Sequence, residues 1–468
     1  MSKHTSILSE LTAVSSLDGR YRSRVEELAP IISEYGLIKN RIIIEAKYLL
    51  ALSVAGATRK FKNDETKLLS EIADGKITDD DIEKVKEIEK ETRHDVKAVE
   101  RMLRVKLEQT TLKDQLEKIH FGLTSEDVNN LSYRLQLKVA TNEILIPILI
   151  VLIEQLMDRA ERFKSLPMLA RTHGQAAIPT TVGKEFAVFA TRLNKQLIKL
   201  QSFRLSGKLT GAVGNFNALQ YTYPEIDWIN FSEDFVTSLG LEPNLNTTQI
   251  NPTEDIVEII QIYQRLNGII IDFDQDMWRY ISDHWFIQAA VKGEVGSSTM
   301  PQKVNPIDFE NSEGRLGIAN SMGDYFVRKL PISRLQRDLS DSTVLREMGT
   351  FLGNSLIGYK STSQGLLRVE PNKDQIDKAL NSDWSILGEG VQTLLRKTGI
   401  ADPYSLISSL TRGGTLNPEK WSEWVEGLLI DEKIKTELKK LTPESYIGLS
   451  VELTEKAIAE IKSSRKDK

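Results

Sequence analysis

The sequence predicts an all-α protein built around a bundle of long helices. Apolar residues recur at helical spacing along most of the chain, and strand-like alternation is sparse. Several of these segments, at about 126–163, 181–205, 253–291, 306–329 and 343–366, are at least twice as long as the average helix of ~11 residues. Long helices with short connections are typical of an elongated bundle.

Further helical segments precede this bundle. One runs from about Ser33 to Ala55, and a charged stretch at about 79–107 forms one or two more. The chain has 468 residues, which is too long for one compact core. We expect an N-terminal helical domain at 1–112, a central long-helix bundle at 113–366 and a C-terminal helical domain at 367–468.

The most apolar run is "ILIPILIVLI", residues 144–153. It is far shorter than the ~18 residues that cross a bilayer, and it contains a proline. We expect a buried part of a longer helix, apolar on all sides because it packs on several neighbours. One chain has too little surface to cover such helices, so we also expect an oligomer.

The composition excludes several classes of function. A net charge of -5 is too small to favour nucleic acid or a membrane surface as the partner. The chain has no cysteine, which excludes disulfides, thiolate catalysis and cysteine-bound metal centres. The histidines lack metal-ligand spacing, so we expect neither a metal nor another cofactor. The N-terminus does not resemble a signal peptide, and we expect a cytoplasmic protein.

Residues 293–306, "GEVGSSTMPQKVNP", form a loop rich in Gly and Ser before a predicted helix. Asn305 suits the N-cap, and the proline after it suits the first helical position. Helix initiation does not account for Lys303 or for the paired serines Ser297 and Ser298. A lysine near a helix N-terminus opposes the helix dipole unless an anion lies between them. The pattern therefore favours a loop that binds an anion.

Two other stretches have both a structural and a functional interpretation. In "ARTHGQ", His173 either caps a turn between helices or exchanges a proton near neutral pH. In "HFGLTSEDV", Thr124 and Asp127 match a capping box, while the same helix start presents hydroxyl and amide groups to an anion. His120 and His284 lie among aromatic residues, which indicates packing.

Arginines form a third candidate group. The stretch "LPISRLQRDLSDSTVLRE" interleaves Arg334, Arg337 and Arg346 with serines and a threonine. It is either a solvated helix surface or a clamp for phosphate or carboxylate. Arg20 and Tyr21, in "LDGRYRSRVEEL", are a weak signal by themselves.

The pattern Gly-Ser-Ser-x-Met-Pro-x-Lys-x-Asn-Pro at 296–306 resembles the signature loop of the fumarase/aspartase superfamily. The stretches "LTAVSSLDGRY", "RHDVKAVE", "TSEDVNN", "RTHGQ", "GAVGN", "TTQINP" and "RDLSDSTVLR" are similar to the bacterial type of the adenylosuccinate lyase family, over nearly the whole chain. The resemblance implies a three-domain fold whose long helices form a twenty-helix core in a homotetramer. It also implies active sites shared between three subunits.

The resemblance implies a reaction in purine nucleotide biosynthesis. Fumarate would be released by β-elimination from adenylosuccinate, giving AMP, and from succinylaminoimidazole carboxamide ribonucleotide (SAICAR), giving AICAR. Ser297 would be the general base and His173 the general acid. The succinyl carboxylates would be held by Thr124, Ser125, Ser298, Lys303, Val304 and Asn305. Phosphate and ribose would be held by Arg20, Tyr21, Arg337, Ser342, Thr343 and Arg346. Further substrate contacts are implied for Arg93, His94, Asp95, Gln249 and Asn311.

Two positions depart from this family pattern. Gln302 stands where many relatives have histidine, and Arg93 stands where close relatives have asparagine. Neither removes the implied acid or base.

Two alternatives remain at this point. A sister enzyme such as argininosuccinate lyase has the same loop, but its substrate lacks the phosphate that the arginines at 337–346 suit. A catalytically silent helical scaffold, as in some lens crystallins of the superfamily, is disfavoured because Ser297 and His173 are both present.

Overall fold

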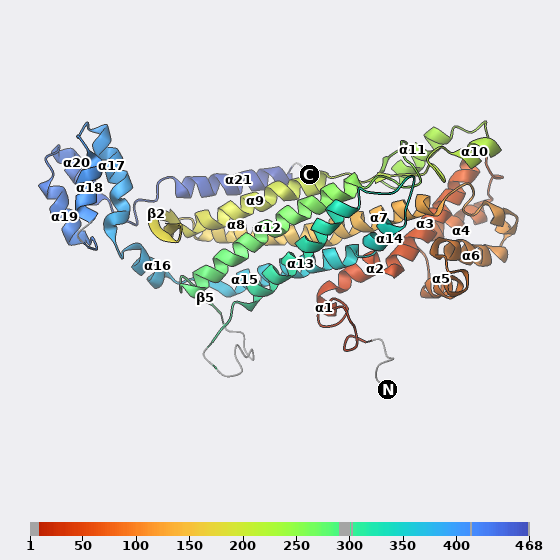
Figure 1. Cartoon of the computed structure of the whole chain (residues 1–468), viewed down its shortest axis with the longest axis horizontal. Coiled ribbons are helices and arrows are strands. Elements are labelled where there is room, and N and C mark those ends of the chain that lie inside the picture. The colour runs from red at the N-terminus through yellow and green to blue at the C-terminus, as the bar shows by residue number, and fades with distance from the viewer. Residues whose placement is uncertain (1–8, 290–299, 301–302, 412–413, 467–468) are drawn as a thin grey trace. The chain divides into compact units, whose positions relative to one another are not determined.

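The structure is a computed structural model that describes residues 9–289, 300, 303–411 and 414–466. It is mostly helical, as predicted (Figure 1). Contacts divide the chain into two units. Unit 1 comprises Met1–Leu149, Leu197–Gly268 and Gly314–Gly358, and unit 2 comprises Ile150–Gln196, Ile269–Glu313 and Tyr359–Lys468. The three-domain division stays a prediction.

Unit 1 contains the N-terminal helices and several short elements. These are α1 (Arg22–Val25), η2 (Glu26–Leu28), α2 (Ala29–Ile32), α3 (Glu34–Ala55), α4 (Asn63–Ala73), α5 (Asp79–Thr92), α6 (Asp95–Glu108), η3 (Thr111–Lys118), α7 (Ser125–Ala140), η4 (Thr141–Leu145), β3 (Ser206–Gly207), α10 (Asn217–Thr222), α11 (Trp228–Ser238), β4 (Glu242–Pro243) and α14 (Ser340–Leu345). The long helices have residues in both units: α8 (Ile146–Arg162), α9 (Val182–Ser202), α12 (Glu254–Ser282), α13 (Ile307–Lys329) and α15 (Met348–Arg368).

Helix α3 organises the core of unit 1. It packs against α4, α6 and α7, and α5 packs on α6 (Figure 1). The apolar side chains on one face of each helix, such as Ile42, Leu69 and Met102, are buried in this core. The helix begins after Ser33, whose hydroxyl accepts from the Gly36 amide, and it ends at Gly56 with a left-handed φ of 83°. These contacts place α6 and the first turn of α7 in the same unit.

The long helix predicted at about 126–163 is continuous from Ser125 to Arg162. A π-helical turn, η4, separates α7 from α8, and the Tyr263 hydroxyl donates to Thr141 Oγ1 at 2.9 Å there. Among the described helices this one meets a length and composition criterion for a membrane span, which the core helix of a folded protein also meets. Half of the apolar run at 144–153 is buried, but Val151 is 43% exposed, as expected if a single chain cannot cover this helix.

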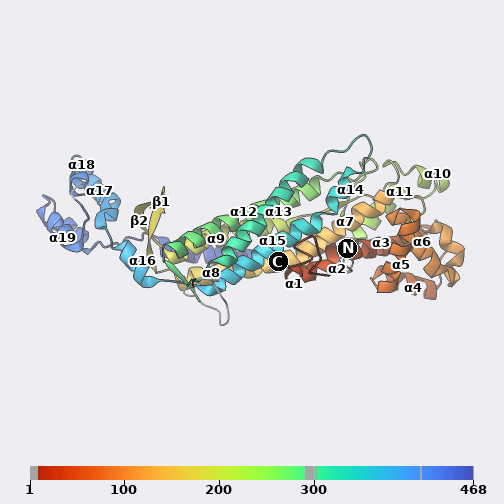
Figure 2. The ribbon, with the colours of Figure 1, turned by 60° about the horizontal axis from the view of Figure 1, so that its bottom comes forward.

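Unit 2 contains a hairpin, a second short sheet and the C-terminal helices. Its remaining elements are β1 (Pro167–Thr172), β2 (Gln175–Thr181), β5 (Phe286–Gln288), β6 (Val369–Pro371), α16 (Lys373–Leu380), η5 (Trp384–Leu387), α17 (Gly388–Lys397), α18 (Pro403–Thr411), α19 (Pro418–Gly427), α20 (Glu432–Lys440) and α21 (Ser450–Lys466). Strand β5 pairs antiparallel with β6, and β1 lies beside α16 (Figure 2).

The stretch "ARTHGQ" is a β-hairpin, so the prediction of a turn between helices is wrong. Thr172 pairs with Gln175, which leaves His173 and Gly174 as the two turn residues. Their φ angles are 53° and 74°. Two consecutive positive φ angles define the type I′ turn, whose twist matches that of the flanking strands. His173 therefore stands exposed at the tip of a rigid hairpin.

Two helix boundaries also differ from prediction. Helix α12 ends at Ser282 rather than near 291, because His284 adopts a left-handed φ of 60° and the chain then forms β5. Helix α13 begins at Ile307. The Pro306 carbonyl accepts from the Glu310 amide at 3.2 Å, so the N-cap is Pro306 and not Asn305.

Candidate active site

The start of α7 is built on a buried ion pair. The predicted capping box is present, with the Thr124 amide donating to Asp127 Oδ2 at 2.8 Å. The other oxygen, Oδ1, accepts from Lys208 Nζ at 2.6 Å, and neither side chain is exposed. The amides of Thr210 and Gly211 donate to the same oxygen. These bonds fix the helix start, and Ser125 follows Thr124 as the first helical residue.

Arg337 links three neighbours beside this helix start. Its Nη1 donates to Gln249 Oε1 at 3.1 Å, and its Nη2 lies 3.4 Å from Ser342 Oγ and 3.3 Å from Glu126 Oε2. Burial raises the pKa of Glu126 to about 7, although the Arg337 charge acts in the opposite direction. The guanidinium is therefore oriented by groups from widely separated parts of the sequence.

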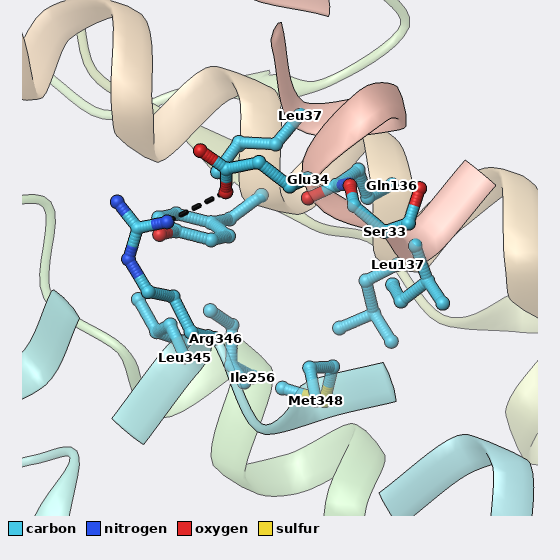
Figure 3. Close-up of a pocket in the computed structure, with 11 residues that line it drawn as sticks. Ser33, Glu34, Leu37, Gln136, Leu137, Ile256, Leu345, Arg346 and Met348 are labelled. Atoms are coloured by element: carbon cyan, nitrogen blue, oxygen red, sulfur yellow. Dashed lines mark hydrogen bonds and ion pairs between the residues drawn. The ribbon is translucent and has the colours of Figure 1, made fainter. Parts of the chain in front are cut away.

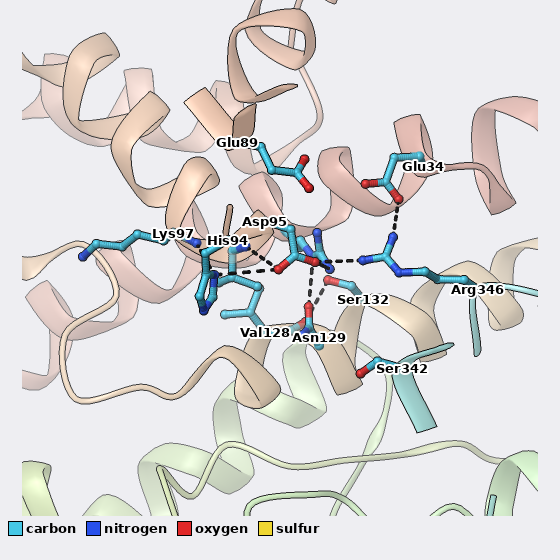
Figure 4. Close-up of polar contacts among 12 residues, drawn as sticks. Glu34, Glu89, His94, Asp95, Lys97, Val128, Asn129, Ser132, Ser342 and Arg346 are labelled. Carbon is cyan, nitrogen blue, oxygen red and sulfur yellow. Dashed lines mark hydrogen bonds and ion pairs between the residues drawn. The ribbon is translucent and has the colours of Figure 1, made fainter. Parts of the chain in front are cut away.

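A second set of charges surrounds Asp95 (Figure 4). Asp95 Oδ2 accepts from Arg41 at 2.7 Å and from Arg346 at 2.9 Å. Burial alone would raise the Asp95 pKa, but Arg41, the Val96 amide and Arg346 together lower it. The Arg346 guanidinium also contacts Glu34 Oε2 at 2.7 Å.

The histidine predicted beside Asp95 has a structural role as well. His94 is the N-cap of α6, and its Nδ1 accepts from the Lys97 amide at 3.2 Å. An accepting Nδ1 leaves Nε2 to carry the proton of the neutral ring. Arg93 precedes it as the C-cap of α5, with a left-handed φ of 50°. This short break between α5 and α6 turns both side chains toward one cavity.

These groups line a cavity of about 410 Å³ in unit 1. It brings together eight of the predicted site residues: Arg93, His94, Asp95, Ser125, Arg337, Ser342, Thr343 and Arg346. Such a concentration of arginines and hydroxyls suits a phosphate or carboxylate ligand. Sequence reasoning missed the other lining residues, which are Arg41, Glu89, Asn129, Tyr133 and Leu339. Asn129 lies one helical turn after Ser125, which is the one signal that could have indicated it.

A smaller cavity of about 190 Å³ lies beside Arg346 (Figure 3). Tyr133 and Arg346 line both cavities. The rest of its lining is largely apolar, including Leu37, Leu137 and Met348. The ion pair between Arg346 and Glu34 closes one side of it.

Four predicted residues of unit 1 do not line the larger cavity. Gln249 accepts a hydrogen bond from Arg337, and Thr124 directly precedes Ser125 in the chain. Arg337 and Ser125 both line the cavity. Tyr21 lies under the Arg315 guanidinium, 3.9 Å from the ring centroid, and Arg20 is adjacent. A hydrogen bond from Arg315 lowers the pKa of Tyr21. A single chain does not bring Arg20 and Tyr21 into the cavity.

The other predicted residues belong to unit 2. His173 is at the hairpin tip, and Asn311 donates to Ser361 Oγ at 2.8 Å. Lys303 and Val304 are exposed before α13, and the Val304 carbonyl accepts from Gln288 Nε2. Asn305 is partly exposed there. Ser297, Ser298 and Gln302 lie outside the described residues.

Comparisons with known proteins cover almost the whole chain. A family model described as lyase matches residues 19–322, and one described as adenylosuccinate lyase C-terminal matches residues 333–447. Curated adenylosuccinate lyases from Haemophilus influenzae and Escherichia coli K12 are 48% and 45% identical, each over 96% of this chain and 99% of the relative. One from Dictyostelium discoideum is 44% identical with the same coverage.

Solved structures show the same fold at low identity. A fumarate lyase from Mesorhizobium sp. BNC1 has a TM-score of 0.75 at 15% identity, covering 93% of this chain and 97% of its own. A 3-carboxy-cis,cis-muconate lactonizing enzyme from Pseudomonas putida has a TM-score of 0.76 at 18% identity, covering 94% and 97%.

The helical fold and the lyase family model define the class: a lyase of the fumarase/aspartase superfamily. The full-length relatives are more specific. The chain belongs to the adenylosuccinate lyase family.

Proposed function

We propose that this chain releases fumarate from adenylosuccinate, giving AMP, and from SAICAR, giving AICAR, in the cytoplasm. The observation that supports this most is the cavity lined by Arg337, Arg346, Ser342 and Thr343, in a chain that matches adenylosuccinate lyases along its length. An arginine fork and clustered hydroxyls are the groups that recognise a nucleotide phosphate.

In the proposed mechanism, the Ser297 alkoxide removes a proton from the carbon beside a succinyl carboxylate. The electron pair left on that carbon forms the double bond of fumarate while the bond from carbon to nitrogen breaks. His173 donates a proton to the departing nitrogen. Its place at a type I′ turn supports this role, because the turn holds the ring on a short, rigid support.

Charge stabilisation is the main demand of this reaction, since the intermediate gathers a second negative charge beside the carboxylate. We assign Lys303, Asn305, Ser298 and the Val304 backbone to the succinyl carboxylates, with Thr124 and Ser125. One preorganised donor contributes roughly 3–4 kcal/mol, or ~10²–10³ in rate. Lys303 and backbone dipoles also favour the ionised form of Ser297. Arg20, Tyr21, Gln249, Asn311 and the Arg93–His94–Asp95 segment complete the proposed contacts.

Argininosuccinate lyase is the second candidate of the same class. Its substrate has no phosphate to bind Arg337 and Arg346, and the full-length relatives are adenylosuccinate lyases. An ultraviolet assay separates the candidates, because AMP formation from adenylosuccinate changes the absorbance. Folded protein that turns over argininosuccinate but not adenylosuccinate would make argininosuccinate lyase the better candidate. Folded protein that is inactive on both substrates would support a silent scaffold.

We predict that Ser297→Ala and His173→Asn each lose at least ~10³ in turnover while still binding substrate. Asparagine tolerates a positive φ better than most residues, so His173→Asn keeps the hairpin turn and removes the acid. Turnover by ultraviolet assay and substrate binding by calorimetry check this. Near-normal turnover in either variant would remove that residue from its assigned role.

A further inference from the structure

Glu126 is a buried carboxylate whose ionic partner, Arg337, lines the larger cavity. It lies in the first turn of α7, beside Ser125, and is 5% exposed. Arg337 Nη2 is 3.3 Å from its Oε2, and Arg337 lines the cavity. Glu126 itself is not one of the lining residues. The carboxylate therefore supports the guanidinium from the protein side.

The other cations near Glu126 form ion pairs with other carboxylates. On α7 itself, Arg134 is paired with Asp255 at 2.8 Å. After β3, Lys208 is paired with Asp127 at 2.6 Å. On α14, Asp341 adds negative charge close to Glu126. Within the described part of the chain, Arg337 is thus the cation in contact with Glu126, and its charge lowers the Glu126 pKa more than those of Arg134 and Lys208 do.

An anion bound in this cavity competes for the same guanidinium. A phosphate that engages Arg337 brings up to two negative charges close to a carboxylate that is already desolvated. Burial raises the Glu126 pKa to about 7, so a modest added repulsion is enough to shift its protonation at neutral pH. Protonation is the low-cost response of a buried acid that loses its counter-ion.

We propose that Glu126 is a proton-linked positioning residue: it orients Arg337 toward the cavity and takes up a proton when a phosphate group binds there. The inference rests on the proposed function, because it assigns the phosphate to this cavity. It adds that nucleotide binding and proton uptake are coupled at a residue outside the binding surface. The one bond formed is the O–H bond of the Glu126 carboxyl group, and the proton comes from solvent.

Calorimetric titration of the full-length protein with AMP tests this. Titrations at pH 7.5 in buffers of different ionisation enthalpy give the number of protons taken up per site. We expect wild type to take up about half a proton or more beyond Glu126→Gln. The neutral isostere retains the ionisation of AMP itself, so the difference isolates Glu126. Glu83→Gln, an exposed position on α5, is the matched control and should behave as wild type.

The pH dependence of the AMP affinity, measured by the same titrations, provides a second test. For a shift of one pKa unit on binding, the affinity of wild type relative to Glu126→Gln falls about sixfold between pH 6.5 and 8.5. Infrared difference spectra of wild type with and without AMP need no variant, and a protonated carboxyl band should appear on binding.

The outcomes separate the two proposals. Equal proton uptake in wild type and Glu126→Gln, or no carboxyl band in wild type, overturns the role of Glu126 while AMP binding leaves the proposed function in place. Failure of wild type to bind AMP overturns the phosphate site and the inference together.

Discussion

Glu126 and Asp127 are neighbouring buried carboxylates that are neutralised in different ways. Asp127 has a fully buried lysine and three backbone amides as partners, so its charge is satisfied inside the protein. Glu126 depends on Arg337, which is shared with a cavity. The same helix turn thus contains one acid that stabilises the structure and one whose ionisation costs free energy.

The stability of the protein should therefore depend on pH through Glu126. Burial raises its folded-state pKa to about 7, against ~4.3 for an unperturbed glutamate in the unfolded chain. A raised pKa means that the folded state holds the proton more tightly. The stability contributed at this position is complete below about pH 4 and is lost as the pH rises through 7.

Glu126→Gln, which cannot ionise, should show no such loss. Relative to wild type, its free energy of unfolding should improve by on the order of 3 kcal/mol between about pH 4.5 and 8. Urea unfolding at fixed protein concentration, without nucleotide, measures this. A pH-independent difference between the two proteins would mean that Glu126 has an ordinary pKa in the folded state.

Arg93 is a second residue that lowers the stability of the folded state, here through its backbone conformation. It holds a left-handed φ of 50° at the C-cap of α5, a conformation that asparagine adopts more readily. Arg93→Asn should raise the free energy of unfolding by up to ~1 kcal/mol. Thermal unfolding measures the gain, and the KM for adenylosuccinate shows whether the guanidinium also contributes to binding. A lower stability would indicate that Arg93 makes a compensating contact in the assembled protein.

At the level of elements, the hairpin β1–β2 shows how backbone conformation positions a chemical group. Gly174 has a φ of 74°, and a side chain there would meet no atom within 4 Å. Gly174→Ala should therefore be strained but not blocked, at a cost of roughly 1–2 kcal/mol. A shifted turn displaces His173, and a displacement of about 1 Å lowers turnover by up to ~10².

Gly56 provides the matched control for this prediction. It also has a positive φ, 83°, and open space around it, but it ends α3. Both alanine variants should lose similar stability in thermal unfolding, and Gly174→Ala alone should lose turnover in the ultraviolet assay. Equal turnover in the two variants would show that the hairpin does not position a catalytic group.

Helical periodicity predicted the long helices because amphipathic faces repeat over many turns. The hairpin was missed because its strands are short and a His-Gly turn lacks the Asn-Gly signal of type I′ turns. The end of α12 was misplaced because the helix stops at residues with no proline or glycine. Without such a stop signal, the helical periodicity alone placed the end near residue 291.

For the candidate site, local motifs identified residues that lie in short breaks between helices, such as His94 and Ser125. Arg41 and Tyr133 lie within regular helices and carry no local signal. The contact between Glu126 and Arg337 joins residues far apart in sequence, and no spacing rule predicts it. The family membership is confirmed, whereas the roles of Ser297 and His173 stay predictions.

At the level of the whole molecule, exposed apolar side chains favour association between copies of the chain. Val151 on α8, Trp278 on α12, and Ile318 and Tyr325 on α13 are each more than 40% exposed. We expect other copies of the chain to cover these side chains. Arg20 and Tyr21, which lie outside the cavity of their own chain, are also consistent with a site completed by another subunit.

We predict a homotetramer whose active sites take the acid and the base from different subunits. Sedimentation should give the tetramer mass. Mixed tetramers of His173→Asn and Ser297→Ala should then regain activity, because some sites receive the intact histidine from one chain and the intact serine from another. Random assembly of equal amounts gives about one quarter of wild-type turnover. Mixing His173→Asn with His173→Ala, the control, should restore nothing. If mass analysis shows mixed tetramers that stay inactive, both groups come from the same chain and the shared-site arrangement is wrong for this pair.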